Sequence, residues 1–271
     1  MSKHPYLIAI DLDGTLLTDD KRITPRTVEY LHGLSKQGHY IVIASGRPLR
    51  ACIKYQEQLD VKAPIICYNG ALTTHPHDEH FPRRLITLEL DIVRQILSEI
   101  DFSYLDNMMI ETPNDIFLFK RDDQLNIFFW NEGLDINYGD PLELLKENPM
   151  TLIFKIKKRT PQFDAFITSV VEKHEHYRLR FWDSSPYCEV YLEHGTKKDA
   201  LVHLSETLHI PHEYTIAIGD AENDIQLLQW ANHSIAMKNG VDVIKNAAVY
   251  ITEEDNNNDG IIKAVKNIIS E

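Results

Sequence analysis

YLIAIDLDGT, residues 6–15, is the stretch of sequence that decides the fold. An apolar run over 6–10 is followed at once by Asp11, Asp13 and Gly14. A short apolar run that ends abruptly in polar residues is typical of a buried parallel strand. Asp11 and Asp13 are two positions apart on an extended chain, so we expect both carboxylates to point the same way. The pattern predicts a ligand site at the carboxyl edge of a parallel sheet.

The same alternation of strands and helices continues on both sides of the middle of the chain. Predicted strands cover 39–45, 63–70, 214–220 and 233–236, and predicted helices cover 25–36, 49–59, 197–208, 222–230, 241–247 and 259–269. Thr24 is expected to cap the first helix, with Pro25 at its first position. Asn69-Gly70 is expected to end a strand and to start a hairpin arm over 71–75. This alternation indicates an α/β layer with a parallel sheet.

The middle of the chain has a different pattern. Predicted strands at 84–88, 103–106, 116–119, 150–156, 177–182 and 187–191 often follow one another directly, with helices expected at 89–100, 140–147 and 161–174. Direct succession of strands is typical of an antiparallel or mixed sheet. We therefore predict a discontinuous Rossmann-like core, 1–81 plus 191–271, with an α+β domain inserted at 82–190.

Composition excludes several classes of partner. The chain has 271 residues and a formal net charge of −13, which disfavours binding to nucleic acid or to anionic membranes. Cys52, Cys67 and Cys188 are scattered and odd in number, so neither disulfides nor a zinc site are expected. The first apolar run is too short for a signal peptide or a membrane span. We expect a cytoplasmic protein, as a monomer or a weak homodimer.

A second group of polar residues lies in GDAEND, residues 219–224. Asp220 ends a predicted strand, and Asn223 and Asp224 follow in the first turn of the next helix, a spacing that lets all three face one point. Acidic residues at a helix start also occur without any ligand, because they complement the helix dipole. Together with Asp11 and Asp13 on another strand, however, they form the set of hard oxygen ligands that Mg²⁺ prefers.

Two further segments offer groups that suit a phosphate. Ser45-Gly46-Arg47 follows a predicted strand, so that a hydroxyl and backbone amides could bind phosphate oxygens, although Ser45 could also cap the next helix and Arg47 could be a surface charge. Lys197 could supply the fixed cation that an aspartate nucleophile and a phosphoryl group require. Lys198 is the competing candidate for this role.

Taken in their order along the chain, these four polar segments resemble the motifs of the haloacid dehalogenase superfamily, and most closely those of its Cof-type sugar-phosphatase-like branch. DLDGT (11–15), ASGRP (44–48), Lys197 and GDAEND (219–224) look like its motifs I to IV, and ICYNGAL (66–72) matches a stretch that this branch carries before its cap. The branch commonly has Thr at the position of Ser45 and often Gly at that of Lys198. The register of Ala200-Leu201 favours Lys197 as the motif III lysine. Lys197 comes 152 positions after Ser45, and this spacing places the cap between motifs II and III, unlike in mutase-like relatives.

The resemblance implies a magnesium-dependent phosphatase that hydrolyses small phosphorylated metabolites, such as sugar phosphates, through a phospho-aspartate. Asp11 would be the nucleophile and Asp13 the general acid and base. Mg²⁺ would be bound by Asp11, the backbone carbonyl of Asp13 and Asp220. Ser45, Gly46, Arg47 and Lys197 would bind the phosphoryl group, and Asn223 and Asp224 would complete or orient the metal site. A phosphomutase, a catalytically weak phospholigand-binding regulator and, more remotely, a two-component receiver are the alternatives.

The inserted domain should determine substrate choice, but its sequence does not identify the substrate. Arg178, Arg180, Trp182 and Tyr187 could contact it, although such residues belong more often to a core or a surface. The run 128–130 is expected in the core or on the inner face of the cap. The histidines at 75, 77 and 80 imitate a metal site, but their Pro-containing context indicates a solvated loop.

Overall fold

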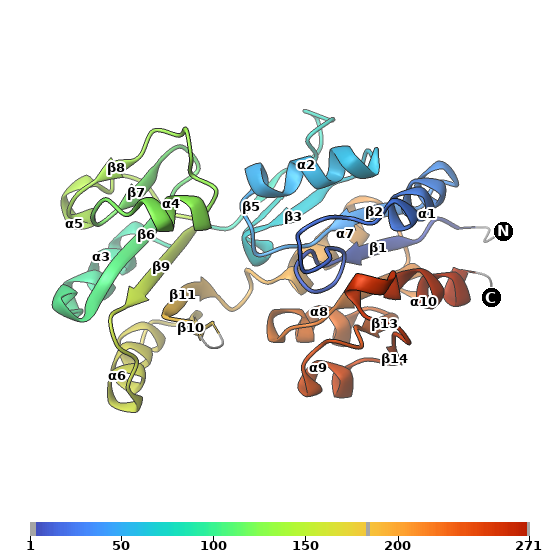
Figure 1. Ribbon diagram of the computed structural model, residues 1–271. Helices are drawn as coiled ribbons and strands as arrows, with labels where there is room; N and C mark the ends of the chain where they lie inside the picture. The colour runs from blue at the N-terminus through green and yellow to red at the C-terminus, as the bar shows by residue number, and fades with distance from the viewer. Residues whose placement is uncertain (1–3, 183–184, 270–271) are drawn as a thin grey trace. The chain divides into compact units, whose positions relative to one another are not determined.

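The computed structural model describes residues 4–182 and 185–269. The chain divides into two compact units, Met1–Arg84 with Thr196–Glu271, and Leu85–Gly195. These divisions fall three and five residues later than the predicted ones at 81/82 and 190/191. Each unit has a main sheet and helices of its own (Figure 1).

The first unit is built on a five-stranded sheet in which every pairing is parallel. Its strands are, in spatial order, β14 (Tyr250–Ile251), β13 (His233–Ala236), β12 (Thr215–Gly219), β1 (Leu7–Ile10) and β2 (Tyr40–Ile43). Strand β1 lies between β12 and β2, with Ile10 opposite both Ile218 and Ile43. The three strands therefore end at the same level, and the residues that follow them meet at one edge.

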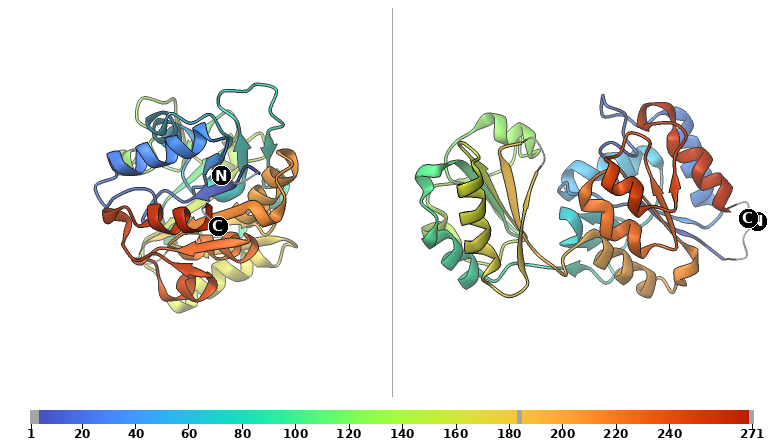
Figure 2. Two further views of the ribbon diagram at one scale, coloured as in Figure 1. Left: turned by 90° about the vertical axis from the view of Figure 1, so that its right-hand side faces the viewer. Right: turned by 90° about the horizontal axis from the view of Figure 1, so that it is seen from below.

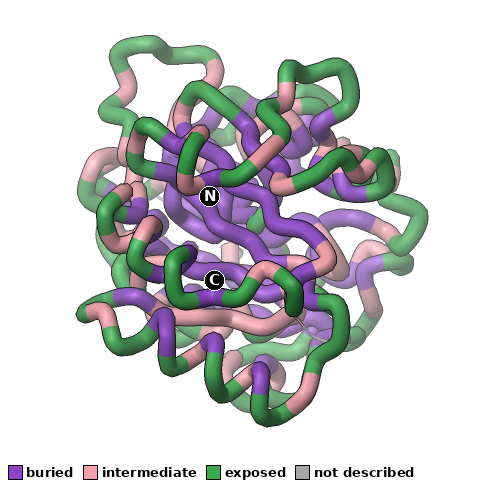
Figure 3. Tube along the Cα trace, turned by 90° about the vertical axis from the view of Figure 1, so that its left-hand side faces the viewer, coloured by how far each residue is buried: buried purple, intermediate pink, exposed green. Residues whose placement is uncertain are grey.

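Helices cover both faces of this sheet, as a parallel sheet requires (Figures 1 and 2). One layer consists of α1 (Pro25–Lys36), α2 (Leu49–Leu59) and α10 (Gly260–Ile269); the other consists of α7 (Lys197–Thr207), α8 (Ile225–Trp230) and α9 (Asp242–Ala247). The predicted start of α1 is confirmed, because the Thr24 side chain accepts a hydrogen bond from the Thr27 N–H and Pro25 follows it. Apolar residues of these strands, such as Leu7, Ile8 and Ile10, are fully buried. Figure 3 marks the buried and exposed stretches along the chain.

The strand predicted over 63–70 is shorter in the structure. Strand β3 covers only Ile65–Cys67 and pairs antiparallel with β4 (Leu72–Thr74), so the expected hairpin is confirmed. Together with β5 (Arg84–Leu85) these strands form a separate three-stranded sheet. Between β3 and β4 lies a 3-10 turn, Tyr68–Gly70, in which φ is +49°, +54° and +109° in turn. Left-handed backbone conformations end the strand early, since extended structure needs negative φ.

The second unit is a six-stranded sheet in which four pairings are antiparallel and one is parallel. Its strands are, in spatial order, β10 (Tyr177–Phe181), β11 (Tyr187–Leu192), β9 (Thr151–Ile156), β6 (Leu105–Glu111), β7 (Ile116–Leu118) and β8 (Asn137–Tyr138). The unit also contains α3 (Leu90–Glu99), α4 (Asp123–Phe128), α5 (Pro141–Leu144) and α6 (Pro161–Glu172). Three short elements were not predicted from the sequence, namely α4, β8 and, in the first unit, β14.

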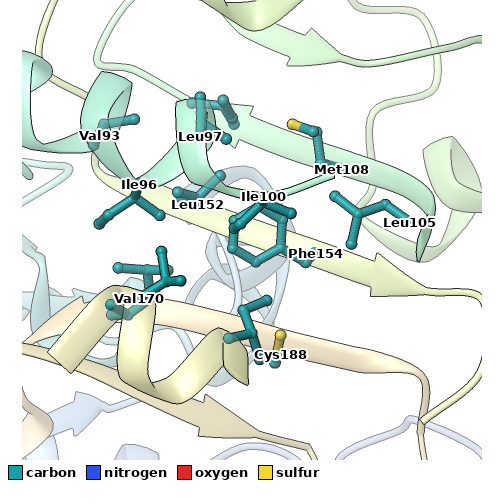
Figure 4. Packing of buried hydrophobic residues seen from close by; sticks show 14 of the residues in the cluster. Val93, Ile96, Leu97, Ile100, Leu105, Met108, Leu152, Phe154, Val170 and Cys188 are labelled. Carbon is teal, nitrogen blue, oxygen red and sulfur yellow. The ribbon is translucent and has the colours of Figure 1, made fainter. Parts of the chain in front are cut away.

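Helices α3 and α6 pack on one face of this second sheet. Val93, Ile96 and Leu97 of α3 and Val170 of α6 meet strand residues such as Phe154 in a fully buried cluster (Figure 4). A smaller apolar cluster on the other face joins Met109 and Ile153 to Leu125 of α4 and to Phe129. Within residues 4–182 and 185–269, no helix is both long and apolar enough to cross a membrane.

Candidate active site

The carboxyl ends of β1 and β12 bring two acidic motifs together. Asp11 follows β1 directly, and its N–H donates a hydrogen bond to the carbonyl of Ile218 in β12, at 3.0 Å. Asp220 follows β12, and its carboxylate accepts a hydrogen bond of 2.8 Å from the Thr15 hydroxyl. Gly14, at φ +75°, lies so close to Asp220 that a Cβ on it would be 2.3 Å from the carboxylate. Only glycine therefore allows the turn after Asp13 to approach Asp220.

A buried lysine connects this edge to α7. The Lys197 ammonium donates hydrogen bonds of 2.6 Å to Asp11 and of 2.6 Å to Asp224. Its side chain is 0% exposed. Lys197 is the first residue of α7, where Thr196 and Asp199 form a capping box that fixes the start of the helix. The Lys198 ammonium instead binds the Asp199 carboxylate at 2.8 Å. Of the two candidate lysines, Lys197 is therefore the one among the acidic residues.

Asp11, Asp220 and Asp224 form a compact acidic group. One carboxylate oxygen from each lies within 4.8 Å of those of the other two. Three carboxylates around a single ammonium group leave an excess of negative charge in a largely buried site. Hard oxygen ligands at this spacing are what a divalent cation such as Mg²⁺ binds, so the donor set fits such an ion.

Burial dominates the electrostatics of this group. It raises the pKa of Asp11 well above its usual range, against the attraction of Lys197 and with added repulsion from Asp224 and Asp220. Burial, followed by the charge of Asp224, raises the pKa of Asp220 to about 6. For Lys197 burial lowers the pKa, but Asp11 and Asp224 outweigh it and the net pKa is raised. Without a cation, burial and mutual repulsion therefore shift Asp11 and Asp220 toward their protonated forms, whereas Lys197 remains charged.

Asp13 has a very different environment from Asp11. Its carboxylate accepts two hydrogen bonds from the Arg47 guanidinium, at 2.5 and 2.6 Å, and one of 2.6 Å from the Lys21 ammonium. Burial raises the pKa of Asp13, but the hydrogen bonds and charge of Arg47, assisted by Lys21, lower it overall. Arg47 is buried, so its interpretation as a surface charge is wrong.

The expected phosphate loop lies next to this ion pair. Ser45 is buried, and its hydroxyl oxygen accepts a hydrogen bond of 3.2 Å from the Arg47 N–H. Gly46 lies against Asn69, since a Cβ on Gly46 would be 3.0 Å from the Asn69 side-chain amide. The side-chain amide of Asn223 also reaches Asn69, donating to its Oδ1 at 2.9 Å.

Asp224 is held by several hydrogen bonds. Beyond its contact with Lys197, its second carboxylate oxygen accepts from the backbone N–H groups of Asp220 and Ala221, at 3.2 and 3.3 Å. Both oxygens are thus engaged by groups of the protein. This arrangement suits a residue that orients Lys197 and the loop after β12.

Three residues that the sequence analysis did not single out belong to this site. Thr15 lies within the DLDGT motif itself, and Asn69 within the ICYNGAL stretch, so both lie in stretches already noted. Lys21 lies in a polar loop with no recognisable pattern, and only the structure reveals its contact with Asp13.

The candidate substrate residues of the inserted domain make contacts within their own unit. Arg178 is ion-paired with Glu193, and Arg180 with Glu189. Tyr187 stacks on Phe128 with ring centroids 5.1 Å apart, and Trp182 lies 5.5 Å from Tyr187. Phe129 is buried whereas Phe128 is exposed.

The histidine-rich loop offers no metal-binding group among the described residues. His77 and His80 are exposed, as expected for a solvated loop. Within residues 4–182 and 185–269, a single group of His, Cys, Asp or Glu residues brings three ligand atoms close enough together to hold a metal ion. That group consists of Asp11, Asp220 and Asp224.

Known proteins with similar sequences support an enzymatic site. A family model described as haloacid dehalogenase-like hydrolase matches residues 8–265. The chain is 32% identical over 273 residues to the 5-amino-6-(5-phospho-D-ribitylamino)uracil phosphatase YitU of Bacillus subtilis, covering 100% of both chains. It is 28% identical to YcsE of the same organism, a phosphatase named for the same compound, covering 96% of this chain and 94% of YcsE.

Solved structures share the fold. The subclass IIB sugar phosphatase BT4131 superposes with a TM-score of 0.81 at 21% identity, over 97% of this chain and 98% of that one. The match covers both the parallel sheet and the inserted unit. The chain therefore belongs to the haloacid dehalogenase-like hydrolases and is a phosphatase of the Cof-type branch of that superfamily.

Proposed function

We propose that this phosphatase hydrolyses a small phosphate monoester with Mg²⁺, through a phospho-aspartate on Asp11. The observation that carries the proposal is the buried Lys197 ammonium, which binds Asp11 directly at 2.6 Å. A fixed positive charge at this position reduces the repulsion between a carboxylate nucleophile and an anionic phosphoryl group. The adjacent carboxylate of Asp220 provides a ligand for a cation at the same point.

The reaction divides into two displacements. In the first, an Asp11 carboxylate oxygen bonds to phosphorus while the ester P–O bond breaks, and Asp13 donates a proton to the leaving alkoxide. In the second, water attacks the phosphorus of the acyl phosphate, Asp13 takes its proton, and the bond to Asp11 breaks. Inorganic phosphate leaves, and both aspartates return to their initial states.

The cations around Asp13 explain how one carboxyl group can serve in both steps. Arg47 and Lys21 hold Asp13 as an anion in the free protein. An incoming phosphate competes for the same two cations, because phosphate accepts hydrogen bonds from Arg and Lys as a carboxylate does. Once their charges are shared with phosphate, the affinity of Asp13 for a proton rises. Asp13 then takes a proton from water before the first step and gives it back to water after the product phosphate leaves.

The residues present fit a bound Mg²⁺. When bound, the ion would neutralise charge on the carboxylates and on the transferring phosphoryl group. Asp11, Asp220 and the backbone carbonyl of Asp13 would hold it, with Asn223 completing the site. Asp224 would orient Lys197, because both of its oxygens are already engaged.

The natural substrate is proposed from the relatives. YitU and YcsE are both named for 5-amino-6-(5-phospho-D-ribitylamino)uracil, and YitU matches this chain over its full length. We therefore propose this compound, a ribityl phosphate that carries a pyrimidine ring, as the substrate. A sugar phosphate is the second candidate, since BT4131 is named a sugar phosphatase.

The choice between these substrates can be measured directly. We expect kcat/KM for 5-amino-6-(5-phospho-D-ribitylamino)uracil to exceed that for hexose and pentose phosphates by about 10-fold or more, because contacts to the ring add binding energy in the transition state. Phosphate release with a panel of both classes tests this expectation. Equal or better turnover of a simple sugar phosphate would reject the ribitylaminouracil assignment.

The nucleophile and the metal requirement form a second test. Asp11→Asn should reduce phosphate release to background, and EDTA should do the same to the unaltered protein until Mg²⁺ is restored, because both the covalent step and charge neutralisation are lost. Asp20→Asn is the control, since Asp20 is exposed and lies in the nearby loop. Activity that survives Asp11→Asn would discard the covalent mechanism.

The two adjacent lysines allow a matched comparison. Lys197→Met should lower kcat/KM by about 10²-fold or more, the effect of removing one donor that stabilises transition-state charge. The kcat/KM of Lys198→Met should remain close to that of the unaltered protein, because the Lys198 ammonium binds Asp199 and not the acidic group at Asp11. Circular dichroism verifies folding of both variants. A larger loss in the Lys198 variant would reassign the catalytic lysine.

Because the pKa of Asp220 is raised, we expect that replacing Asp220 by a neutral residue stabilises the folded protein, by an amount that depends on pH. The protonated form of Asp220 contributes stability to the folded protein. This contribution is fully present below pH 3.8, the ordinary pKa of the group, and is lost as the pH rises through about 6. Asp220→Asn should therefore raise the Tm of the metal-free protein by about 2–4 °C at pH 7.5 and by less at pH 4.5. Differential scanning calorimetry in EDTA tests this, with the exposed Asp60→Asn as control. Equal shifts at both pH values would contradict it.

A further inference from the structure

The 3-10 turn Tyr68–Gly70 adopts a backbone conformation that side chains disfavour. Tyr68 and Asn69 both have positive φ, +49° and +54°, and Gly70 follows at +109°. Asn tolerates this region better than most residues, but a bulky residue such as Tyr rarely adopts it. Such conformations persist only where the surroundings impose them, and they gather at functional sites. The surroundings of the turn therefore indicate what it does.

Backbone contacts attach the turn to two segments of the active site. The Tyr68 N–H donates to the Arg47 carbonyl at 3.1 Å, and the Asn69 N–H donates to the Ser45 carbonyl at 3.0 Å. On the other side, Gly70 lies against the start of α7, where a Cβ would be only 2.1 Å from the Thr196 carbonyl oxygen. The turn thus lies between the expected phosphate loop and the helix that begins with Lys197.

The Asn69 side chain reaches a third segment. It is largely buried, and its Oδ1 accepts a hydrogen bond of 2.9 Å from the side-chain Nδ2 of Asn223, 154 residues away in sequence. A side-chain amide has one acceptor oxygen and one donor NH₂ group. Because the NH₂ group of Asn223 is directed at Asn69, its carbonyl oxygen is the atom left to accept from, or to ligate, another group. That oxygen is the type of ligand that Mg²⁺ prefers.

We propose that Asn69 is a positioning residue that fixes the orientation of the Asn223 amide, and that it thereby sets the affinity of the site for Mg²⁺. This inference rests on the proposed function, which places Mg²⁺ at Asp11 and Asp220. Groups that orient metal ligands through a hydrogen bond strongly affect metal affinity, although they do not touch the ion. Asn69 itself contacts Asn223 and lies against Gly46, so it acts through other residues.

A purely structural role for Asn69 makes a different prediction. In that case its only task would be to permit the left-handed turn, and glycine, which adopts positive φ readily, would replace it without loss of metal binding. Asn69→Gly keeps the backbone conformation and removes only the amide. The variant therefore separates the side-chain hydrogen bond from the shape of the turn.

The test is a double-mutant cycle with Mg²⁺ binding as the readout. Isothermal titration calorimetry with Mg²⁺ alone is performed on the unaltered protein, Asn69→Gly, Asn223→Ala and the double variant. We expect Asn69→Gly and Asn223→Ala each to weaken Mg²⁺ binding by about 10-fold. The double variant should bind no more weakly than Asn223→Ala, because Asn69 acts through Asn223.

His209→Gly is the matched control, because His209 also has a left-handed backbone, at φ +53°, but is exposed and has no place in the site. It should leave Mg²⁺ affinity unchanged. Unaltered affinity in Asn69→Gly, or an equal further loss on adding it to Asn223→Ala, would overturn the inference while leaving the proposed function intact. If the unaltered protein did not bind Mg²⁺, the proposed function would fail, and this inference with it.

Discussion

One buried ammonium group, that of Lys197, brings together the carboxylates on which the rest of the active site depends. Burying a charge is costly unless partners compensate it, and here Asp11 and Asp224 each approach it to 2.6 Å. Asp11 lies 186 residues from Lys197 in sequence, so the pair forms only when β1 and α7 are both in place. Because Asp220 adds a third carboxylate, this pairing leaves negative charge uncompensated. Protonation of a carboxyl group or a bound cation would relieve this excess charge, so the proposed metal site is coupled to the packing of the fold.

Much of this arrangement could be predicted because it is encoded locally. An apolar run that ends in two aspartates specifies a buried parallel strand and the direction of its last side chains, as found for β1 and Asp11. The same logic applies to β12 and Asp220. The position of Ala200-Leu201 relative to the family motif favoured Lys197 without deciding between the two lysines. In the structure Lys197 lies among the acidic residues, whereas Lys198 binds Asp199.

Other features escaped prediction because they depend on residues far apart in sequence. The hydrogen bond between Asn223 and Asn69 and the contact of Lys21 with Asp13 have no local pattern. The short strands β8 and β14 carry too few residues for a period to show. The Asn69-Gly70 pair did predict a turn. Its left-handed residues, however, also shorten β3 and bring Gly70 against Thr196, a contact that sequence alone does not reveal.

Two aspartates separated by a single residue thus acquire opposite properties. Asp11 is buried beside other carboxylates, and its pKa is raised, whereas Arg47 and Lys21 lower the pKa of Asp13. A pair of acids whose environments push their pKa values apart is suited to two different roles. In the proposed mechanism, Asp11 would become an effective nucleophile only once cations surround it, which would tie its reactivity to an assembled site. Asp13 would stay ionised until the phosphate competes for Arg47 and Lys21, so the arrival of the phosphate itself would make the proton donor available.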